Sequence, residues 1–179
     1  MQLPNGLTIR LLDTTNPEEI AAYEKAVYMA FSSVVDPSFE IIWKIDHANK
    51  RISTKIPYSS QKIMVAETDG SIIAGSPLNF NMQEKPQLEY FDFKIDSSEP
   101  GICEGLLLFN TRISLNNHLI LPQLKEPIIR FLKSQQIRKI YGTCSKRRLR
   151  NYRFLGFKDI DMKLINGVQK YLLVYNLQW

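Results

Sequence analysis

The segment from Ser145 to Phe157 reads Ser-Lys-Arg-Arg-Leu-Arg-Asn-Tyr-Arg-Phe-Leu-Gly-Phe and contains the signals of a short helix with a defined start and end. Ser145 is a residue type that caps a first helical turn, and Gly156 can adopt the left-handed conformation that closes a helix. Leu149 and Tyr152 are three residues apart, so they share one face. We therefore predict a helix with Tyr152 in its last turn, where the phenol is held in a fixed position.

Apolar runs on both sides of this helix have the composition of β-strands. Residues 137–143 form one such run, and two further strand-like runs follow the helix. Earlier in the chain, residues 102–113 contain Leu-Leu-Leu-Phe, which is apolar on both sides as expected of a central strand. Between these runs, a helix is predicted to begin at Pro122 or Pro127 and to end near Gln136.

The N-terminal half of the chain contains three elements with local signals. Residues 7–12 alternate between apolar and polar side chains and predict a first strand. Asn16 and Pro17, followed by two glutamates, predict the start of a helix, because they supply a cap, a proline in the first turn and acidic residues at the positive helix end. Asp69-Gly70 lies between two apolar runs and predicts a β-hairpin with a type I′ turn.

Three segments complete the assignment of secondary structure. A second helix is predicted to begin near Asp36 and Pro37, because apolar side chains recur at helical spacing as far as residue 45. Residues 52–60 are predicted to be a loop that includes Pro57. Residues 88–95 alternate and predict a strand.

The composition indicates an ordinary globular domain. A chain of 179 residues with 44% hydrophobic residues can form a substantial core, so we expect one domain over residues 1–179. No apolar run approaches the ~20 residues needed to cross a bilayer, and residues 1–6 lack the regions of a signal peptide. We therefore expect a cytoplasmic protein. Cys103 and Cys144 are expected to be buried thiols, and the cysteine and histidine spacing predicts no metal site.

Positive charge is concentrated near the C-terminus. Residues 121–170 contain 13 Lys or Arg and 3 acidic residues, a net charge of +10 in a chain whose total is +5. Such a surface attracts anions, including nucleic acid, phosphorylated carriers, acidic proteins and anionic lipids. Arginine mixed with aromatic residues in the helix that contains Tyr152 also suits phosphate and base contacts, so nucleic-acid binding is one alternative, although no known nucleic-acid-binding motif is present.

The order strand, helix, Tyr-x-x-Leu-Gly-Phe, strand resembles the C-terminal half of the GNAT N-acyltransferase superfamily. This resemblance implies an α/β (α+β) fold with a mixed, mostly antiparallel central sheet and helices on both faces. It implies an acyl group moved from a pantetheine thioester to the amine of a small molecule. The resemblance gives Tyr152 the role of the acid that protonates the departing thiolate. A GNAT-like module that binds a ligand without catalysis is a second alternative.

The resemblance also concerns the donor. GNAT enzymes hold the pyrophosphate of coenzyme A in a glycine-rich loop before the helix that here starts near Pro122, but residues 114–122 contain no glycine. Asn116, Asn117 and His118 are the remaining candidate donors to phosphate in that segment. This departure is similar to autoinducer synthases and long-chain N-acyl amino acid synthases, which take acyl chains from acyl carrier protein. The donor is therefore expected to be either acyl-CoA or the phosphopantetheine of a carrier protein, with Ser145, Arg147 and Arg148 as donor contacts.

In this family, the thioester enters where the fourth and fifth strands separate, which here are residues 102–113 and 137–143. The resemblance therefore implies that the backbone of Leu108, Phe109 and Asn110 contacts the pantetheine arm. Glu104 is the candidate base for the amine, because it is a lone carboxylate in an apolar strand. Two structural readings remain open: Glu104 exposed at the start of its strand, and Tyr152 as a core tyrosine.

Overall fold

The computed structural model describes residues 6–111 and 120–178. In chain order, the strands and helices are β1 (Thr8–Leu11), α1 (Pro17–Phe31), β2 (Trp43–Asp46), β3 (Arg51–Thr54), β4 (Gln61–Thr68), β5 (Ser71–Asn79), β6 (Ile102–Gly105), β7 (Phe109–Asn110), α2 (Ile120–Ser134), β8 (Lys139–Ser145), α3 (Lys146–Phe154), β9 (Lys158–Ile165) and β10 (Val168–Asn176). Three short 3₁₀ helices are η1 (Phe39–Ile41), η2 (Tyr58–Ser60) and η3 (Gln87–Phe91).

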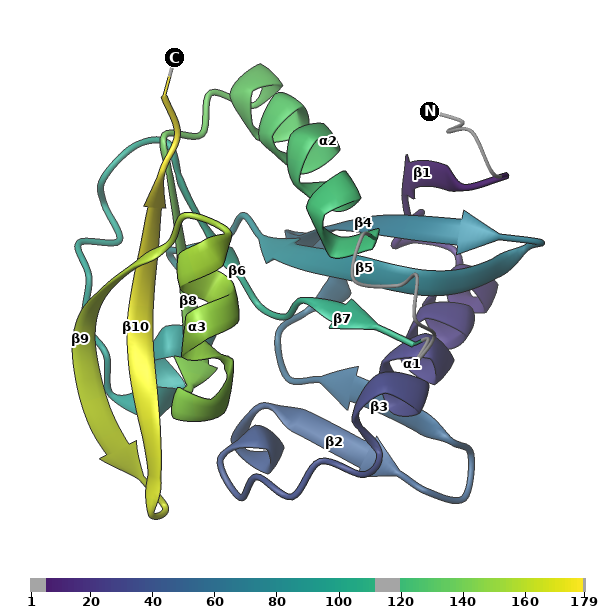
Figure 1. The fold of residues 1–179 in the computed structure, drawn as a ribbon, viewed down its shortest axis with the longest axis horizontal. Helices are drawn as coiled ribbons and strands as arrows, with labels where there is room; N and C mark the ends of the chain where they lie inside the picture. The colour runs from purple at the N-terminus through teal and green to yellow at the C-terminus, as the bar shows by residue number, and fades with distance from the viewer. Residues whose placement is uncertain (1–5, 112–119, 179) are drawn as a thin grey trace.

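Most strands of the described chain belong to one mixed sheet. Its order is β1-β4-β5-β6-β8-β10-β9, and β7 also pairs with β5. All its pairs are antiparallel except β6 and β8, which are parallel and connected through α2. In Figure 1, the half built on β4 and β5 and the half built on β8, β9 and β10 run in very different directions, so the sheet opens near its centre.

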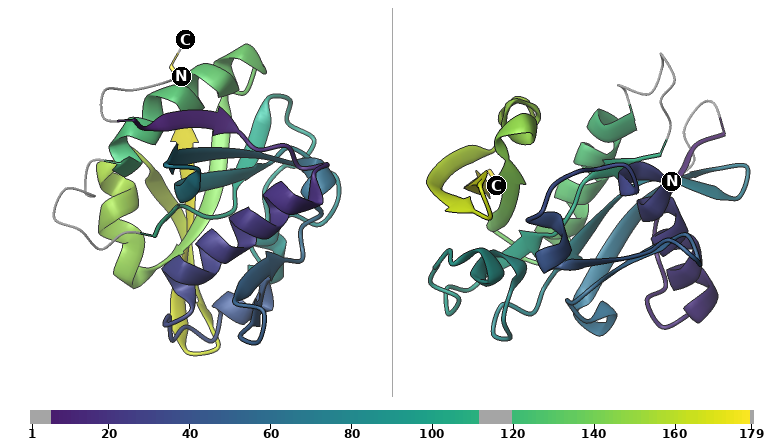
Figure 2. Two further views of the ribbon diagram at one scale, coloured as in Figure 1. Left: turned by 90° about the vertical axis from the view of Figure 1, so that its right-hand side faces the viewer. Right: turned by 90° about the horizontal axis from the view of Figure 1, so that it is seen from below.

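Helices cover both faces of this sheet. α1 packs through Tyr23 and Val27 onto one face, in a core that also contains residues of the β2–β3 hairpin. α2 packs on the other face through residues such as Leu124 and Leu132, and α3 contributes Leu149 to a smaller cluster with β8 and β10. The two views of Figure 2 show α1 on one side of the strands, and α3 beside the C-terminal strands. The predicted fold class is therefore confirmed.

Local signals placed α1 and the first hairpin correctly. The side chain of Asn16 accepts hydrogen bonds from the backbone N–H groups of Glu18 and Glu19, as its position before Pro17 predicts. Asp69 has a positive φ of 50°, which the turn between β4 and β5 requires.

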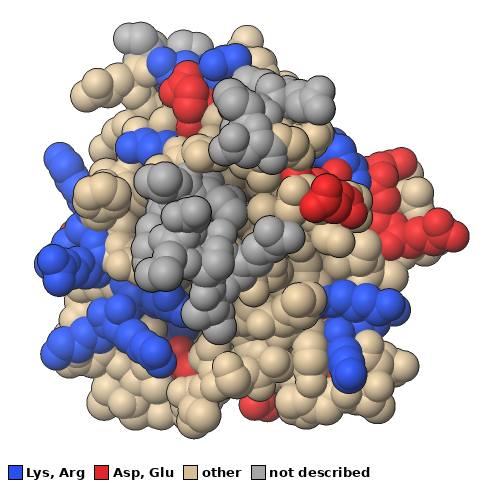
Figure 3. Space-filling view, turned by 45° about the vertical axis from the view of Figure 1, so that its right-hand side comes forward, with Lys and Arg blue, Asp and Glu red and all other residues tan. Residues whose placement is uncertain are grey.

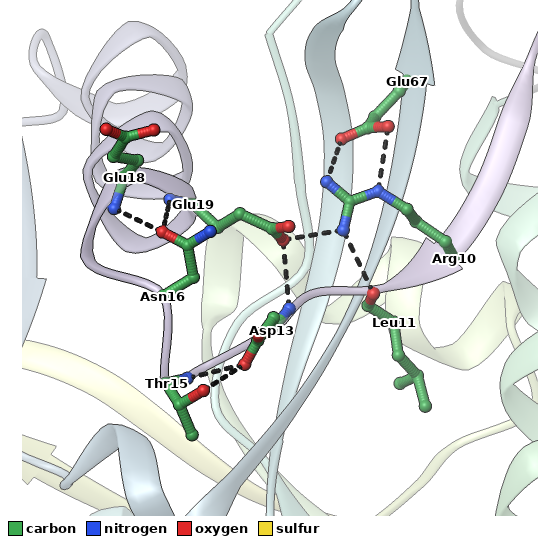
Figure 4. A network of polar contacts seen from close by, with 8 residues as sticks. All are labelled: Arg10, Leu11, Asp13, Thr15, Asn16, Glu18, Glu19 and Glu67. Carbon is green, nitrogen blue, oxygen red and sulfur yellow. Dashed lines mark hydrogen bonds and ion pairs between the residues drawn. The ribbon is translucent and has the colours of Figure 1, made fainter.

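An ion-pair network ties α1 to the sheet edge (Figure 4). The Arg10 guanidinium of β1 donates two hydrogen bonds to Glu67 of β4, at 3.0 and 2.8 Å, and a third to Glu19 at 2.7 Å. Glu19 also accepts the backbone N–H of Asp13. Glu19 therefore joins α1 to β1.

The predicted helix beginning near Asp36 is wrong. That segment contains only η1, and Trp43 begins the hairpin of β2 and β3, so part of the predicted loop at 52–60 is also strand. The turn of this hairpin is closed by Asp46, whose carboxylate accepts the backbone and side-chain N–H groups of Asn49. The apolar spacing that favoured a helix also fits η1 followed by a strand.

The predicted strand at 88–95 is also wrong, because residues 87–91 form η3. The first turn of η3 is held by a residue distant in sequence, since the Glu104 carboxylate accepts the N–H groups of Gln87 and Leu88 at 2.8 and 2.7 Å. A tertiary contact therefore overrides the alternating pattern at this position.

Residues 102–113 are not one strand. β6 ends at Gly105, and the chain leaves the sheet before β7 begins at Phe109. The predicted helix between the central strands is confirmed as α2, although it begins before Pro122 and contains Pro127. In the part of the chain that the structure describes, no helix is long and apolar enough to span a membrane.

Candidate active site

The central strands separate after four paired residues. Residues Ile102–Gly105 of β6 lie beside Lys139–Gly142 of β8 in parallel register. β6 then ends, and Phe109 of β7 pairs with Gly75 of β5, whereas β8 continues alongside β10 as far as Ser145. The predicted separation of these two strands is therefore present, and it begins directly after Gly105.

The backbone between β6 and β7 is available at this opening. Among the described residues, no hydrogen bond is formed by the backbone N–H or C=O of Leu107 or Leu108. Phe109 and Asn110 instead lie in β7, where their registers place them opposite Gly75 and Ala74. Of the three predicted backbone contacts, Leu108 has its polar groups open, and the other two residues are in a paired strand.

A cavity of about 990 Å³ lies at the opening. One part of its wall is aromatic, and the rings of Phe31, Phe39 and Trp43 are stacked in sequence with centroid distances of 5.3 and 5.8 Å. The α3 side of the wall is basic, and includes Lys146, Arg147, Arg148 and Arg150. This combination suits a ligand with an apolar part and an anionic part.

Tyr152 lies at the cavity wall in the last turn of α3, as predicted. It is half-buried, and its ring meets that of Phe157 edge-on at a centroid distance of 5.5 Å. Gly156 has a φ of 99° and closes the helix, with the N–H of Phe157 donating to the carbonyl of Tyr152. Burial raises the pKa of the phenol above its usual value. Within the described structure its hydroxyl forms no hydrogen bond, so a protonated donor stands at the cavity.

Glu104 is fully buried, so the alternative of an exposed carboxylate at the strand start is wrong. Its pKa is raised to about 7 by burial, while the N–H groups of Gln87 and Leu88 oppose the rise. Glu104 is not part of the cavity wall, but Gln87, which donates to it through the backbone, is. A carboxylate with a pKa of about 7 can act as a general base at neutral pH. Glu104 contacts the wall residue Gln87 but does not itself line the cavity.

The remaining predicted donor contacts lie at the start of α3 or outside the described residues. Ser145 occupies the N-cap position, but its side chain forms no capping hydrogen bond, contrary to the sequence prediction. Arg147 and Arg148 are exposed and border the cavity. Figure 3 shows a group of basic side chains gathered along one side of the molecule. Asn116, Asn117 and His118 fall outside the described residues.

The cavity wall also contains two groups of polar residues that were not predicted from the sequence. The Gln87 amide donates to the carbonyl of Leu106 at 3.0 Å and to the hydroxyl of Thr143 at 3.3 Å, so it bridges the diverging strands. Asp36 and Lys170, which also line the cavity, form an ion pair at 3.8 Å. No sequence pattern marks either pair, because each joins residues far apart in the chain. Among the described residues, no group of three potential metal ligands is present.

No protein-family model and no curated protein matches the sequence. Solved structures do match. The CoA-dependent acyl-homoserine lactone synthase BjaI, solved with SAM and isopentyl-CoA, is 15% identical with a TM-score of 0.75, over 97% of this chain and 84% of that one. The acyl-homoserine lactone synthase LasI is 11% identical with a TM-score of 0.73, over 96% and 90% of the two chains.

An N-acetyltransferase matches at a lower TM-score. The ribosomal-protein-S18-alanine N-acetyltransferase from Escherichia coli is 10% identical with a TM-score of 0.61, over 97% of this chain and 95% of that one. Identities this low establish the fold alone. The chain therefore has the GNAT fold, in a form that it shares with acyl-homoserine lactone synthases.

Proposed function

We propose that this protein is an N-acyltransferase that moves an acyl group from a pantetheine thioester to the amine of a small molecule. The observation that carries the proposal is the opening between β6 and β8 with the Tyr152 phenol at its wall. The similarity in fold to BjaI, whose structure contains isopentyl-CoA, supports an acyl-CoA donor.

In the proposed reaction, the pantetheine arm lies beside Leu107 and Leu108, whose unpaired backbone groups satisfy its amides. The amine nitrogen attacks the thioester carbonyl, and the carbon–sulfur bond then breaks. Tyr152 donates its proton to the departing thiolate. Glu104 accepts the proton lost by the amine through water, because its pKa of about 7 suits a base at neutral pH but its carboxylate lies behind the cavity wall.

The walls of the cavity favour particular donors. The stacked rings of Phe31, Phe39 and Trp43 provide apolar contact for an acyl chain. The exposed arginines of α3 suit the phosphates of coenzyme A or the acidic surface of an acyl carrier protein. We propose that a carrier protein docks on α3 when it is the donor.

One observation favours a second candidate, a ligand-binding module without catalysis. Both oxygens of Glu104 already accept backbone N–H groups, and this accounts for a buried carboxylate with no catalytic role. In that case the cavity binds acyl thioesters but does not consume them. Transfer and binding must therefore be measured separately.

The decisive experiment incubates the purified protein with acyl-CoA thioesters of several chain lengths, or with the same acyl groups on carrier protein, together with a panel of amines. Release of free thiol and formation of an N-acyl product, followed by mass spectrometry, support the proposal. Calorimetric binding of acyl-CoA without thiol release supports the silent module. Absence of both binding and release contradicts both candidates.

A further inference from the structure

The side-chain amide of Gln87 lies where the ladder between β6 and β8 stops. The last paired residues are Gly105 and Gly142, so the next pair in this parallel register would be Leu106 with Thr143. Nε2 of Gln87 donates to the carbonyl of Leu106 at 3.0 Å and to the hydroxyl of Thr143 at 3.3 Å. The amide of Gln87 therefore bridges the two residues that would continue the ladder.

The oxygen of this amide is an acceptor without a donor. Because the carbonyl of Leu106 can only accept a hydrogen bond, the amide atom that contacts it is the nitrogen, and Oε1 is the other atom. Gln87 is 3% exposed, and its Oε1 forms no hydrogen bond within the described residues. Most buried side-chain acceptors have a partner, and an unpaired one destabilises the folded state. Oε1 of Gln87 thus requires an explanation.

The location of Gln87 distinguishes it from similar buried groups. The described residues contain two more buried side-chain oxygens without a partner, the hydroxyl of Tyr23 and Oε1 of Gln61. Neither of these residues lines the cavity at the opening between β6 and β8, whereas Gln87 does. Of the three, only Gln87 is placed to receive a hydrogen bond from a ligand in that cavity.

Gln87 also connects the cavity to Glu104. Its backbone N–H donates to Oε2 of Glu104 at 2.8 Å, while Glu104 itself does not line the cavity. In the proposed reaction the amine proton passes through water to Glu104, so the amine approaches the part of the wall that contains Gln87. An amine nitrogen attacks a carbonyl with its lone pair, and its N–H groups remain available as donors.

We propose that Gln87 orients the attacking amine: Oε1 accepts one N–H of the amine and so directs the nitrogen lone pair at the thioester carbonyl. This inference rests on the proposed acyltransferase function and adds a substrate contact to its site. Gln87 neither gains nor loses a proton, because a second amine proton passes to Glu104 and Tyr152 protonates the thiolate. After transfer, Oε1 accepts the N–H that remains in the amide product.

The contact with an N–H can be tested without turnover. The probes are N-butyloctanamide and butyl octanoate, which have the same chain lengths but carry an N–H and an oxygen, respectively, next to the acyl carbonyl. The ester oxygen cannot donate to Oε1, so the wild type should bind the amide about tenfold more tightly than the ester in calorimetry. In Gln87→Met, which keeps an unbranched side chain but lacks the amide, this preference should be lost.

Gln61→Met is the matched control. Gln61 is also fully buried, its Nε2 donates to the carbonyl of Ile56 at 2.8 Å, and its Oε1 has no partner, but it does not line the cavity. Its replacement should leave the preference for the amide unchanged. Loss of the preference in both variants would assign the effect to general destabilisation and contradict the contact.

Kinetics separate orientation of the amine from a structural role of Gln87. With octanoyl-CoA as donor and butylamine, or the amine that turns over best, as acceptor, Gln87→Met should lower kcat/KM for the amine about tenfold and leave KM for octanoyl-CoA unchanged. Collapse of the opening would instead weaken binding of the donor as well.

The outcomes distinguish this proposal from the proposed function. If the wild type binds the two probes equally, or binds neither, the role of Gln87 is overturned whether or not transfer occurs. This result does not depend on the folding of any variant. Absence of transfer to every amine, together with a preference for the amide that depends on Gln87, contradicts the proposed enzyme alone.

Discussion

The ring of Phe109 lies directly against Gly75, the residue opposite it on β5. A Cβ atom at position 75 would approach Cε1 of Phe109 to 2.8 Å and the carbonyl oxygen of Met64 to 3.1 Å. The absence of a side chain at position 75 leaves room for the Phe109 ring where β7 pairs with β5, and Phe109 forms part of the cavity wall. The glycine thus fixes one side of the candidate site.

Gly75→Ala is expected to destabilise the protein by about 1 to 3 kcal/mol, since the methyl group must displace a buried ring. Urea unfolding measures the change. Gly105→Ala is the comparison, because there the nearest atom to the added carbon is Cγ2 of Ile140 at 3.7 Å, an ordinary contact. Equal stabilities of the two variants would show that the ring has room to move.

Tyr152→Phe is expected to lower kcat by about tenfold to a hundredfold, since the thiolate must then leave without a positioned acid. KM for both substrates should change little. Tyr171→Phe, a change in a neighbouring residue of the same small cluster, is the control and should keep wild-type turnover. Unaltered turnover in Tyr152→Phe removes the general-acid role.

Glu104 links the stability of the protein to pH. Burial raises its pKa from 4.5 to about 7, so the folded protein retains this proton to a higher pH than the unfolded chain. The raised pKa of Glu104 therefore adds its whole stabilisation to the free energy of unfolding below pH 4.5. This stabilisation is lost as the pH rises through 7. The loss is roughly 3 kcal/mol. Glu104→Gln should flatten this decline in urea titrations between pH 4.5 and 8.

Activity should follow the opposite trend, because only the ionised carboxylate accepts a proton. We expect kcat/KM to rise with pH and to level off above about 7. In Glu104→Gln this rise should disappear together with most of the activity. A variant that keeps both the rate and the pH profile would leave Glu104 with the structural task of holding η3.

The arginines of α3 are expected to matter for large donors. Replacing Arg147, Arg148 and Arg150 with alanine should raise KM for an acyl carrier protein at least about tenfold, since several attractive charges are lost at once. KM for acyl-pantetheine, which carries no protein or nucleotide, should be unaffected. The carrier-protein effect should shrink as salt is added, and a salt-independent effect would exclude electrostatic docking.

The Arg10 network should contribute to stability but not to activity. Arg10→Met removes charge-assisted bonds to Glu67 and Glu19, and about 1 kcal/mol of stability should be lost, because all three side chains are partly solvated. Arg130→Met provides the comparison, since its single 3.6 Å pair with Glu126 is largely exposed and should contribute nothing measurable. Turnover of both variants should match the wild type.

Elements with local signals could be predicted from the sequence. The cap at Asn16, the Asp69-Gly70 turn and the helix that ends at Gly156 each depend on a few adjacent residues. The last of these placed Tyr152 in the final turn of its helix, and the resemblance to GNAT enzymes placed it at the thioester site. In contrast, η3 depends on the distant Glu104, and the β2–β3 hairpin has an apolar spacing that also fits a helix.

The electrostatic part of the site could not be predicted in the same way. Burial of Glu104 depends on η3, which was itself assigned wrongly. The weak pairing of Lys170 depends on a loop more than 130 residues earlier in the chain, at Asp36. Periodicity in the sequence predicts the face of an element on which a residue lies. It does not predict which charged side chains come into contact in the cavity wall.

The early end of the β6–β8 ladder has a consequence for the evolution and engineering of this protein. The four backbone N–H and C=O groups of Leu107 and Leu108 have no hydrogen-bond partners in the described structure. Each would gain a hydrogen bond if the β6–β8 ladder continued past Gly105. Selection for thermal stability alone would therefore favour closing the opening between β6 and β8. The most stable variants would then be those that can no longer bind a substrate there.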